Sequence, residues 1–205
     1  MTKETYARAL LASGALKINV AQPFRLTSGL LSPFYVDCRL VIGHADARRT
    51  ILAGLVDLAK NIARPDVIAG GVTAGVPMAS LLAHEVHLPL CYIRPEPKAH
   101  GAGKQIEGAD VAGKRVLLVE DLITKGSSIA KFQAALKDAG ATFEDILVIL
   151  SRAGDATLAD LKKQRLRLHA LLTLDDLLAQ AGLDGDQRRA IEAFQNNPEG
   201  WQQGR

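Results

Sequence analysis

Short apolar runs alternate with helical patterns through the middle of the chain. The runs have the length of buried strands, and we expect strands at 66–69, 90–93, 115–119, 146–150 and near 165–172. Between the runs, apolar side chains recur at helical spacing, and we expect helices over 4–13, 45–63, 77–85, from about 128, and near 174–181 and 187–194. This alternation predicts an α/β fold whose central sheet is mostly parallel, with right-handed crossovers.

The segment from Val116 to Ser128 carries the most chemical information. Four apolar residues form a strand that Glu120 and Asp121 end, and a loop of small hydroxyl and glycine residues then opens into a helix. Free backbone N–H groups at a helix start, together with the helix dipole, hold a phosphate, and Gly126 permits a close approach. The acidic pair would repel a phosphate, but it suits ribose hydroxyl groups or a developing positive charge. The alternative is an ordinary strand-to-helix turn with a solvated acidic pair.

A cationic segment, residues 94–104, joins two of the expected strands. It contains Arg94, Lys98, His100 and Lys104 among small and flexible residues. Alone, this pattern is typical of a solvated surface loop. Beside a phosphate cradle it indicates a mobile lid, because cationic donors stabilise a departing pyrophosphate and closure excludes water.

The loops after residues 69, 93 and 119 all follow expected strands. The carboxyl ends of parallel strands share one edge of a sheet, where ligands of such folds bind. We therefore expect the phosphate cradle and the lid to lie together at that edge.

The segment 116–128 resembles the signature of the type I phosphoribosyltransferases, which bind 5-phosphoribosyl 1-diphosphate (PRPP). Within that group, the chain is similar over nearly its whole length to the orotate phosphoribosyltransferase family. The likeness rests on a hood pattern at 24–39, the lid cations, Ser151-Arg152 after the last core strand, and the pattern at 172–177. It implies the type I phosphoribosyltransferase fold as one domain over residues 1–205, with a central mostly parallel sheet flanked by helices. It also implies a small N-terminal hood, formed by about residues 1–40 and part of the C-terminal segment.

The resemblance implies a pentosyltransferase that moves the 5-phosphoribosyl group of PRPP to orotate. The products would be orotidine 5′-monophosphate and pyrophosphate, in de novo pyrimidine (UMP) biosynthesis. The implied cofactor is Mg²⁺, held through the substrate phosphates without direct protein ligands. The implied assembly is a homodimer in the cytoplasm whose lid reaches the neighbouring subunit's site, without a nucleic-acid or membrane partner.

The residues that match the family's sites fall into three groups. The implied catalytic residues are Arg94, Lys98, His100 and Asp121. The implied PRPP-binding residues are Arg94, Lys98, His100, Glu120, Asp121, Leu122, Ile123, Thr124, Lys125, Gly126, Ser127 and Ser128. Orotate is expected to contact Thr124 and Arg152, because a planar guanidinium matches a planar carboxylate.

Four positions depart from the better-known family pattern. Thr27, Ala74 and Pro95 stand where many members carry a lysine, and Lys125 replaces a small residue in the cradle. Since the cations of the lid remain, we expect activity with weaker PRPP binding.

The composition of the chain argues against a nucleic-acid-binding protein, a membrane-spanning protein and a cysteine metal site. A net charge of +3 over 205 residues gives no basic face for nucleic acid, and no apolar stretch is long enough to span a bilayer. Cys38 and Cys91 lack metal-ligand spacing, so we expect two buried, reduced thiols. Two rival functions stay open: a phosphoribosyltransferase for another base, and a PRPP-sensing regulator that binds nucleic acid on the same fold.

Overall fold

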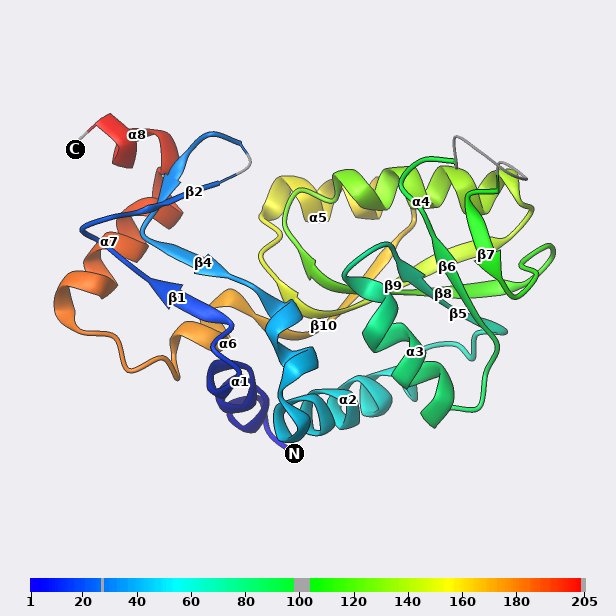
Figure 1. The fold of residues 1–205 in the computed structure, drawn as a ribbon. Helices are drawn as coiled ribbons and strands as arrows, with labels where there is room; N and C mark the ends of the chain where they lie inside the picture. The colour runs from blue at the N-terminus through cyan, green and yellow to red at the C-terminus, as the bar shows by residue number, and fades with distance from the viewer. Residues whose placement is uncertain (27, 98–103, 204–205) are drawn as a thin grey trace.

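A six-stranded sheet forms the centre of the molecule (Figure 1). The computed structural model describes residues 1–26, 28–97 and 104–203, with side chains as far as residue 201. In spatial order the strands are β10 (Arg167–Thr173), β9 (Thr142–Ser151), β8 (Arg115–Ile123), β5 (Val67–Gly71), β6 (Leu90–Ile93) and β7 (Ile106–Gly108). All neighbouring strands are parallel except β6 and β7, which are antiparallel. The predicted α/β fold with a mostly parallel sheet is confirmed.

Helices cover both faces of this sheet, which explains why its strands are apolar without alternation. One face carries α1 (Lys3–Ala12), α2 (Ala45–Ala59) and α3 (Gly75–Glu85), and the other carries α4 (Ser127–Asp138) and α5 (Asp155–Lys163) (Figure 1). Along β8, Leu117 and Val119 are buried in the cluster of the first face, whereas Val116 and Leu118 join the cluster of the second.

Two small antiparallel sheets and three C-terminal helices stand beside the central sheet (Figure 1). The sheets pair β1 (Leu16–Ile18) with β4 (Phe34–Val36) and β2 (Phe24–Arg25) with β3 (Leu31–Ser32). The helices are α6 (Leu174–Leu178), α7 (Gly185–Asn196) and α8 (Pro198–Gln203). We call these four strands and three helices the hood. A 3₁₀ helix, η1 (Cys38–Gly43), follows β4 and leads to α2.

The structure corrects the expected end of the central strand. β8 runs past Val119 to Ile123, because Leu122 and Ile123 stay in register with Leu150 and Ser151 of β9. The acidic pair therefore lies within the strand and does not end it.

Other departures have similar local causes. No strand was expected between residues 93 and 115, but residues 106–108 form β7 against β6. Helix α5 was not expected, because it buries only Leu161 and has little apolar pattern. Helix α2 ends at Ala59, before the expected position 63. Both cysteines are free and buried, as predicted. No helix in the described ranges is both long and apolar enough to cross a bilayer.

A buried carboxylate joins β9 to β10 at the end of the sheet opposite the cradle. Asp145 accepts two hydrogen bonds from Arg167, at 2.8 and 2.7 Å, and lies 2.8 Å from Nε2 of His169. Burial opposes ionisation of Asp145, but the hydrogen bonds from Arg167 and His169 outweigh it and lower the pKa of this carboxyl.

We expect Asp145→Asn to lower the free energy of unfolding by about 1–3 kcal/mol at neutral pH, because charged hydrogen bonds are lost. A depressed folded-state pKa contributes stability above the unfolded value, about 4, and that contribution disappears as the pH falls through the folded value. Urea unfolding of both proteins at several pH values measures the difference. A wild-type advantage that grew on acidification would contradict this account.

Candidate active site

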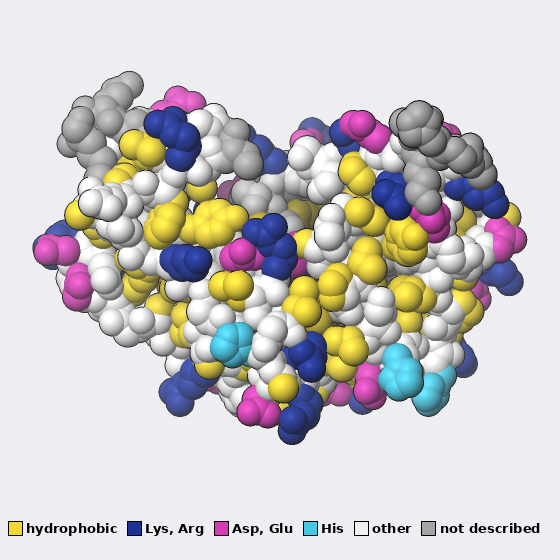
Figure 2. All heavy atoms as spheres, in the orientation of Figure 1, with side chains coloured by type: hydrophobic (Ala, Val, Ile, Leu, Met, Phe, Trp, Pro, Cys, Tyr) yellow, Lys and Arg dark blue, Asp and Glu magenta, His cyan; other side chains and the backbone are white. Residues whose placement is uncertain are grey.

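The ends of β8 and β9 place the predicted phosphate cradle beside Arg152. The backbone N–H of Arg152 donates to the carbonyl of Ile123 at 2.8 Å, which ties the two strand ends together. These ends face the hood (Figure 1), and Figure 2 shows the molecular surface hollowed between the hood and α5. The predicted loops after β5, β6 and β8 begin at one edge of the sheet, because these three strands are parallel neighbours. The loop after β9, which was not among those predicted, begins at the same edge.

The loop after β8 enters α4 through a left-handed residue. Gly126 has φ +69° and stands at the N-cap of α4, where no side chain caps the first turn. A residue with a Cβ is strained in this conformation. The first N–H groups of α4 lack partners within the helix, so they can bind an anion. Thr124, Lys125, Ser127 and Ser128 are all exposed around this turn.

Glu120 is buried behind the turn that joins β5 to α3. Its side chain fills the space of a Cβ at Gly71, which would lie 1.7 Å from Oε1. A Cβ at Gly75 would be in tight contact with it, 3.1 Å from Oε2. Burial, followed by the negative charge of Asp121, raises the pKa of Glu120 to about 8. Burial therefore favours the neutral form of this carboxyl near neutral pH.

Asp121 is the more accessible member of the acidic pair. Its Oδ1 accepts a hydrogen bond from the N–H of Leu122 at 2.8 Å. Burial raises its pKa, while the Leu122 N–H and the charge of Arg39 oppose that change. Arg39 itself holds Asp37 through two hydrogen bonds of 2.6 and 2.9 Å at the start of η1. Asp37 and Arg39 lie in the predicted hood pattern, but no feature of the sequence indicated that they lie near the acidic pair.

Arg152 is half-buried and has no carboxylate partner among the described residues. Its Cζ lies 4.7 Å from the centre of the Phe34 ring, and its Nε is buried without a hydrogen-bond partner. Burial lowers the pKa of Arg152. A cavity of about 600 Å³ opens beside it between α5 and the helices α6 to α8, and Leu158 and Phe194 are among its lining residues.

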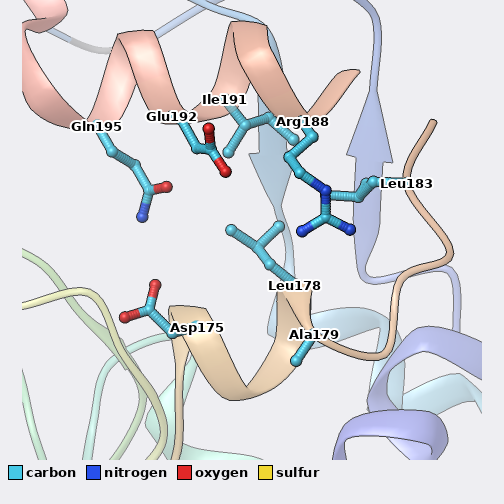
Figure 3. Close-up of a pocket in the computed structure, with 8 residues that line it drawn as sticks. All are labelled: Asp175, Leu178, Ala179, Leu183, Arg188, Ile191, Glu192 and Gln195. Atoms are coloured by element: carbon cyan, nitrogen blue, oxygen red, sulfur yellow. The ribbon is translucent and has the colours of Figure 1, made fainter. Parts of the chain in front are cut away.

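A smaller cavity, of about 220 Å³, lies between α6 and α7 (Figure 3). Leu178 and Ile191 line it together with charged side chains such as Arg188 and Glu192. No residue of the cradle borders this cavity, so we assign it no part in the site.

The described part of the lid starts from the β6–β7 hairpin. Nε of Arg94 donates to Glu107 at 2.9 Å, and the Tyr92 hydroxyl donates to the other carboxylate oxygen of Glu107, also at 2.9 Å. Glu96 accepts a hydrogen bond from Lys131 of α4 at 3.1 Å. In this structure the Arg94 side chain is held by the hairpin; Lys98 and His100 lie outside the described residues, as does Thr27.

The β5–α3 turn supplies a second helix start at the same edge. Ala74 is the N-cap of α3, again without a side-chain cap, and the Val72–Thr73 peptide bond is cis. Gly75 lets this turn approach β8, because a Cβ there would lie 2.3 Å from the Val119 carbonyl oxygen. The edge therefore combines two helix starts without side-chain caps, two carboxyls of raised pKa, and a guanidinium that no carboxylate of the described residues pairs with.

Comparisons with known proteins identify the family of this chain. A phosphoribosyl transferase domain model matches residues 46–168. An orotate phosphoribosyltransferase of Jannaschia sp. (strain CCS1) is 41% identical over 203 residues, which cover 95% of this chain and 89% of the relative.

Two solved structures are also similar. The UMP synthase of Leishmania donovani gives a TM-score of 0.81 at 26% identity; the match covers 96% of this chain and 42% of the synthase chain. The orotate phosphoribosyltransferase of Mycobacterium tuberculosis H37Rv, solved in complex with PRPP, gives a TM-score of 0.67 at 26% identity, covering 85% of this chain and 98% of that one. With this extent of identity along nearly its whole length, the chain belongs to the orotate phosphoribosyltransferase family of type I phosphoribosyltransferases.

Proposed function

We propose that this chain transfers the 5-phosphoribosyl group of PRPP to orotate, giving orotidine 5′-monophosphate and pyrophosphate in pyrimidine biosynthesis. One observation carries the proposal: a helix start without a side-chain cap, an acidic pair, and an arginine that has no carboxylate partner among the described residues lie together at the carboxyl ends of β8 and β9. The helix start suits a phosphate, the acidic pair suits a ribose, and the arginine suits a carboxylated base. Phosphate, ribose and base follow one another in this order in the substrates and the product.

The 5-phosphate is assigned to residues 122–128, which comprise the end of β8, the turn after it and the first residues of α4. The backbone N–H groups of this turn and its hydroxyl side chains would bind the anion, and Lys125 adds a positive charge. The Mycobacterium tuberculosis relative solved with PRPP supports this ligand.

The acidic pair is assigned to the ribose. Asp121 would accept hydrogen bonds from its hydroxyl groups. Substitution at an anomeric carbon passes through an oxocarbenium-like state, whose positive charge nearby carboxylates stabilise. A nitrogen of orotate is the attacking atom and pyrophosphate leaves, so no side-chain nucleophile is required.

Pyrophosphate is assigned to the lid and the β5–α3 turn. Arg94, Lys98 and His100 would neutralise the departing charge, with backbone N–H groups near Gly75 as further donors. Because Arg94 forms an ion pair with Glu107 in this structure, that pair must open before Arg94 can bind the departing pyrophosphate. Ala74 supplies no charge here, which fits weaker PRPP binding.

Mg²⁺ is proposed as the cofactor, held mainly through the substrate. Within the described ranges, no group of three or more His, Cys, Asp or Glu could hold a metal ion. Mg²⁺ keeps several waters and binds substrate phosphates, so no direct protein ligand is assigned to it. When bound, Mg²⁺ neutralises charge on the diphosphate.

Orotate is assigned to Arg152 and Thr124. The guanidinium lacks a carboxylate among the described residues, so a substrate carboxylate can supply one. We also propose a cytoplasmic homodimer whose lids are shared between subunits, with no nucleic-acid or membrane partner.

Orotate and uracil differ in the carboxylate that Arg152 is proposed to bind. We therefore expect turnover of orotate with PRPP and Mg²⁺, measured by loss of orotate absorbance, and little turnover of uracil. Arg152→Lys should raise the KM for orotate by about tenfold or more, because a point charge replaces a planar fork, while the KM for PRPP stays near wild type.

Turnover of another base in place of orotate would overturn the assignment of the reaction. If Arg152→Lys instead raised both KM values equally, only the assignment of Arg152 to the orotate carboxylate would be contradicted.

The raised pKa of Glu120 predicts a pH-dependent rate. Only the ionised carboxylate stabilises positive charge on the ribose, so kcat should rise with pH through about 8. Glu120→Gln should lower kcat by about tenfold or more and remove this rise, because a neutral amide cannot ionise. Rate profiles of the two proteins measured under saturating substrate test this. The same inflection in Glu120→Gln would assign the titration to another group.

A further inference from the structure

The guanidinium of Arg152 is held by an aromatic ring. It stacks on Phe34 with 4.7 Å between Cζ and the ring centre, and no carboxylate of the described residues pairs with it. On another side it borders the cavity of about 600 Å³. Its position before substrate binds therefore depends on the position of the Phe34 ring.

Phe34 is in turn fixed by the C-terminal helices. Phe194 of α7 meets it edge to face, with ring centres 5.9 Å apart and an interplanar angle of 89°. Trp201 of α8 meets Phe194 in the same way, at 5.7 Å and 86°. Such edge-to-face contacts prefer one orientation, so each ring limits the rotation of the next. The series Trp201, Phe194, Phe34 and Arg152 runs without a break from the surface helix α8 to the proposed base site.

The aromatic residues of this series differ in how much of their side chains is exposed to solvent. Phe34 and Phe194 are buried, whereas Trp201 is half-buried on the last helix. Phe194 also lines the cavity beside Arg152. If Phe194 shifted, both its ring contact with Phe34 and one wall of that cavity would change together. A change at Trp201 can therefore reach Arg152 without removing a fully buried side chain.

We propose that Phe194 and Trp201 are positioning residues that hold Arg152, through Phe34, in the orientation that binds the base. This rests on the proposed function, in which Arg152 binds the orotate carboxylate. The C-terminal helices thereby set the affinity for the base and leave PRPP binding to the cradle. A purely structural role for the two rings would lower stability without separating the two substrates.

Substitutions at Trp201 test the proposal by kinetics. Trp201→Leu should raise the KM for orotate about threefold to tenfold, the size of one lost aromatic contact, with the KM for PRPP within about twofold of wild type. Trp201→Phe keeps a ring and should restore the orotate KM. Glu199→Ala, an exposed change on the same helix, is the matched control and should leave both values unchanged.

Fluorescence gives a second readout, because Trp201 is the only tryptophan of the chain. Titration with orotidine 5′-monophosphate, excited at the red edge of tryptophan absorption, should change the emission of the wild type and saturate. Phe194→Leu should bind the nucleotide more weakly and lose most of the change. Unchanged wild-type emission at saturating nucleotide would overturn the proposal, as would equal effects of Trp201→Leu on both KM values.

Arg152→Lys distinguishes a failure of the proposed base site from a failure of the positioning role of Phe194 and Trp201. If it raises the orotate KM while Trp201→Leu does not, Arg152 binds the base but is not positioned from α8, and the inference fails alone. If Arg152→Lys has no effect on that KM, the proposed base site fails and the inference fails with it.

Discussion

The close approach of the β5–α3 turn to the end of β8 is the constraint on which the rest of the site depends. Gly71 and Gly75 leave room for the Glu120 side chain, and a Cβ at either position would meet its carboxylate. The contact buries Glu120, raises its pKa, and brings the starts of α3 and α4 to one edge of the sheet. Two helix starts and two carboxyls thus lie around the space proposed for a sugar that carries a phosphate and a diphosphate.

The hood completes this edge from the other side. Phe34 of β4 provides the surface on which Arg152 rests, and Asp37 and Arg39, just after β4, act on Asp121 by charge. Burial raises the pKa of the Cys38 thiol, and the charges of Asp121 and Arg152 both act on it, so the hood, the acidic pair and Arg152 are close neighbours. The groups proposed for the ribose and for the base therefore share one buried support.

The sequence predicted those parts of the fold that depend on local pattern. The strand–acid–acid–loop–helix segment lies where it was expected, because apolar periodicity and a loop of small hydroxyl and glycine residues are readable from residues 116–129. The true end of β8 could not be read, since it depends on pairing with β9 far along the chain. The stacking of Phe34 against Arg152 and Phe194 was missed for the same reason: the three residues meet only after the sheet and hood have formed. The assignments of Lys98 and His100 stay predictions, outside the described residues.

The central claim is that the turn from Thr124 to Ser128 binds the 5-phosphate of PRPP while the acidic pair binds its ribose. A crystal structure of the protein with PRPP and Mg²⁺ tests it most directly. The account predicts phosphate oxygens within about 3 Å of main-chain nitrogens of this turn, with Asp121 against the ribose hydroxyl groups. A phosphate bound elsewhere, with these nitrogens directed away from it, would contradict the account.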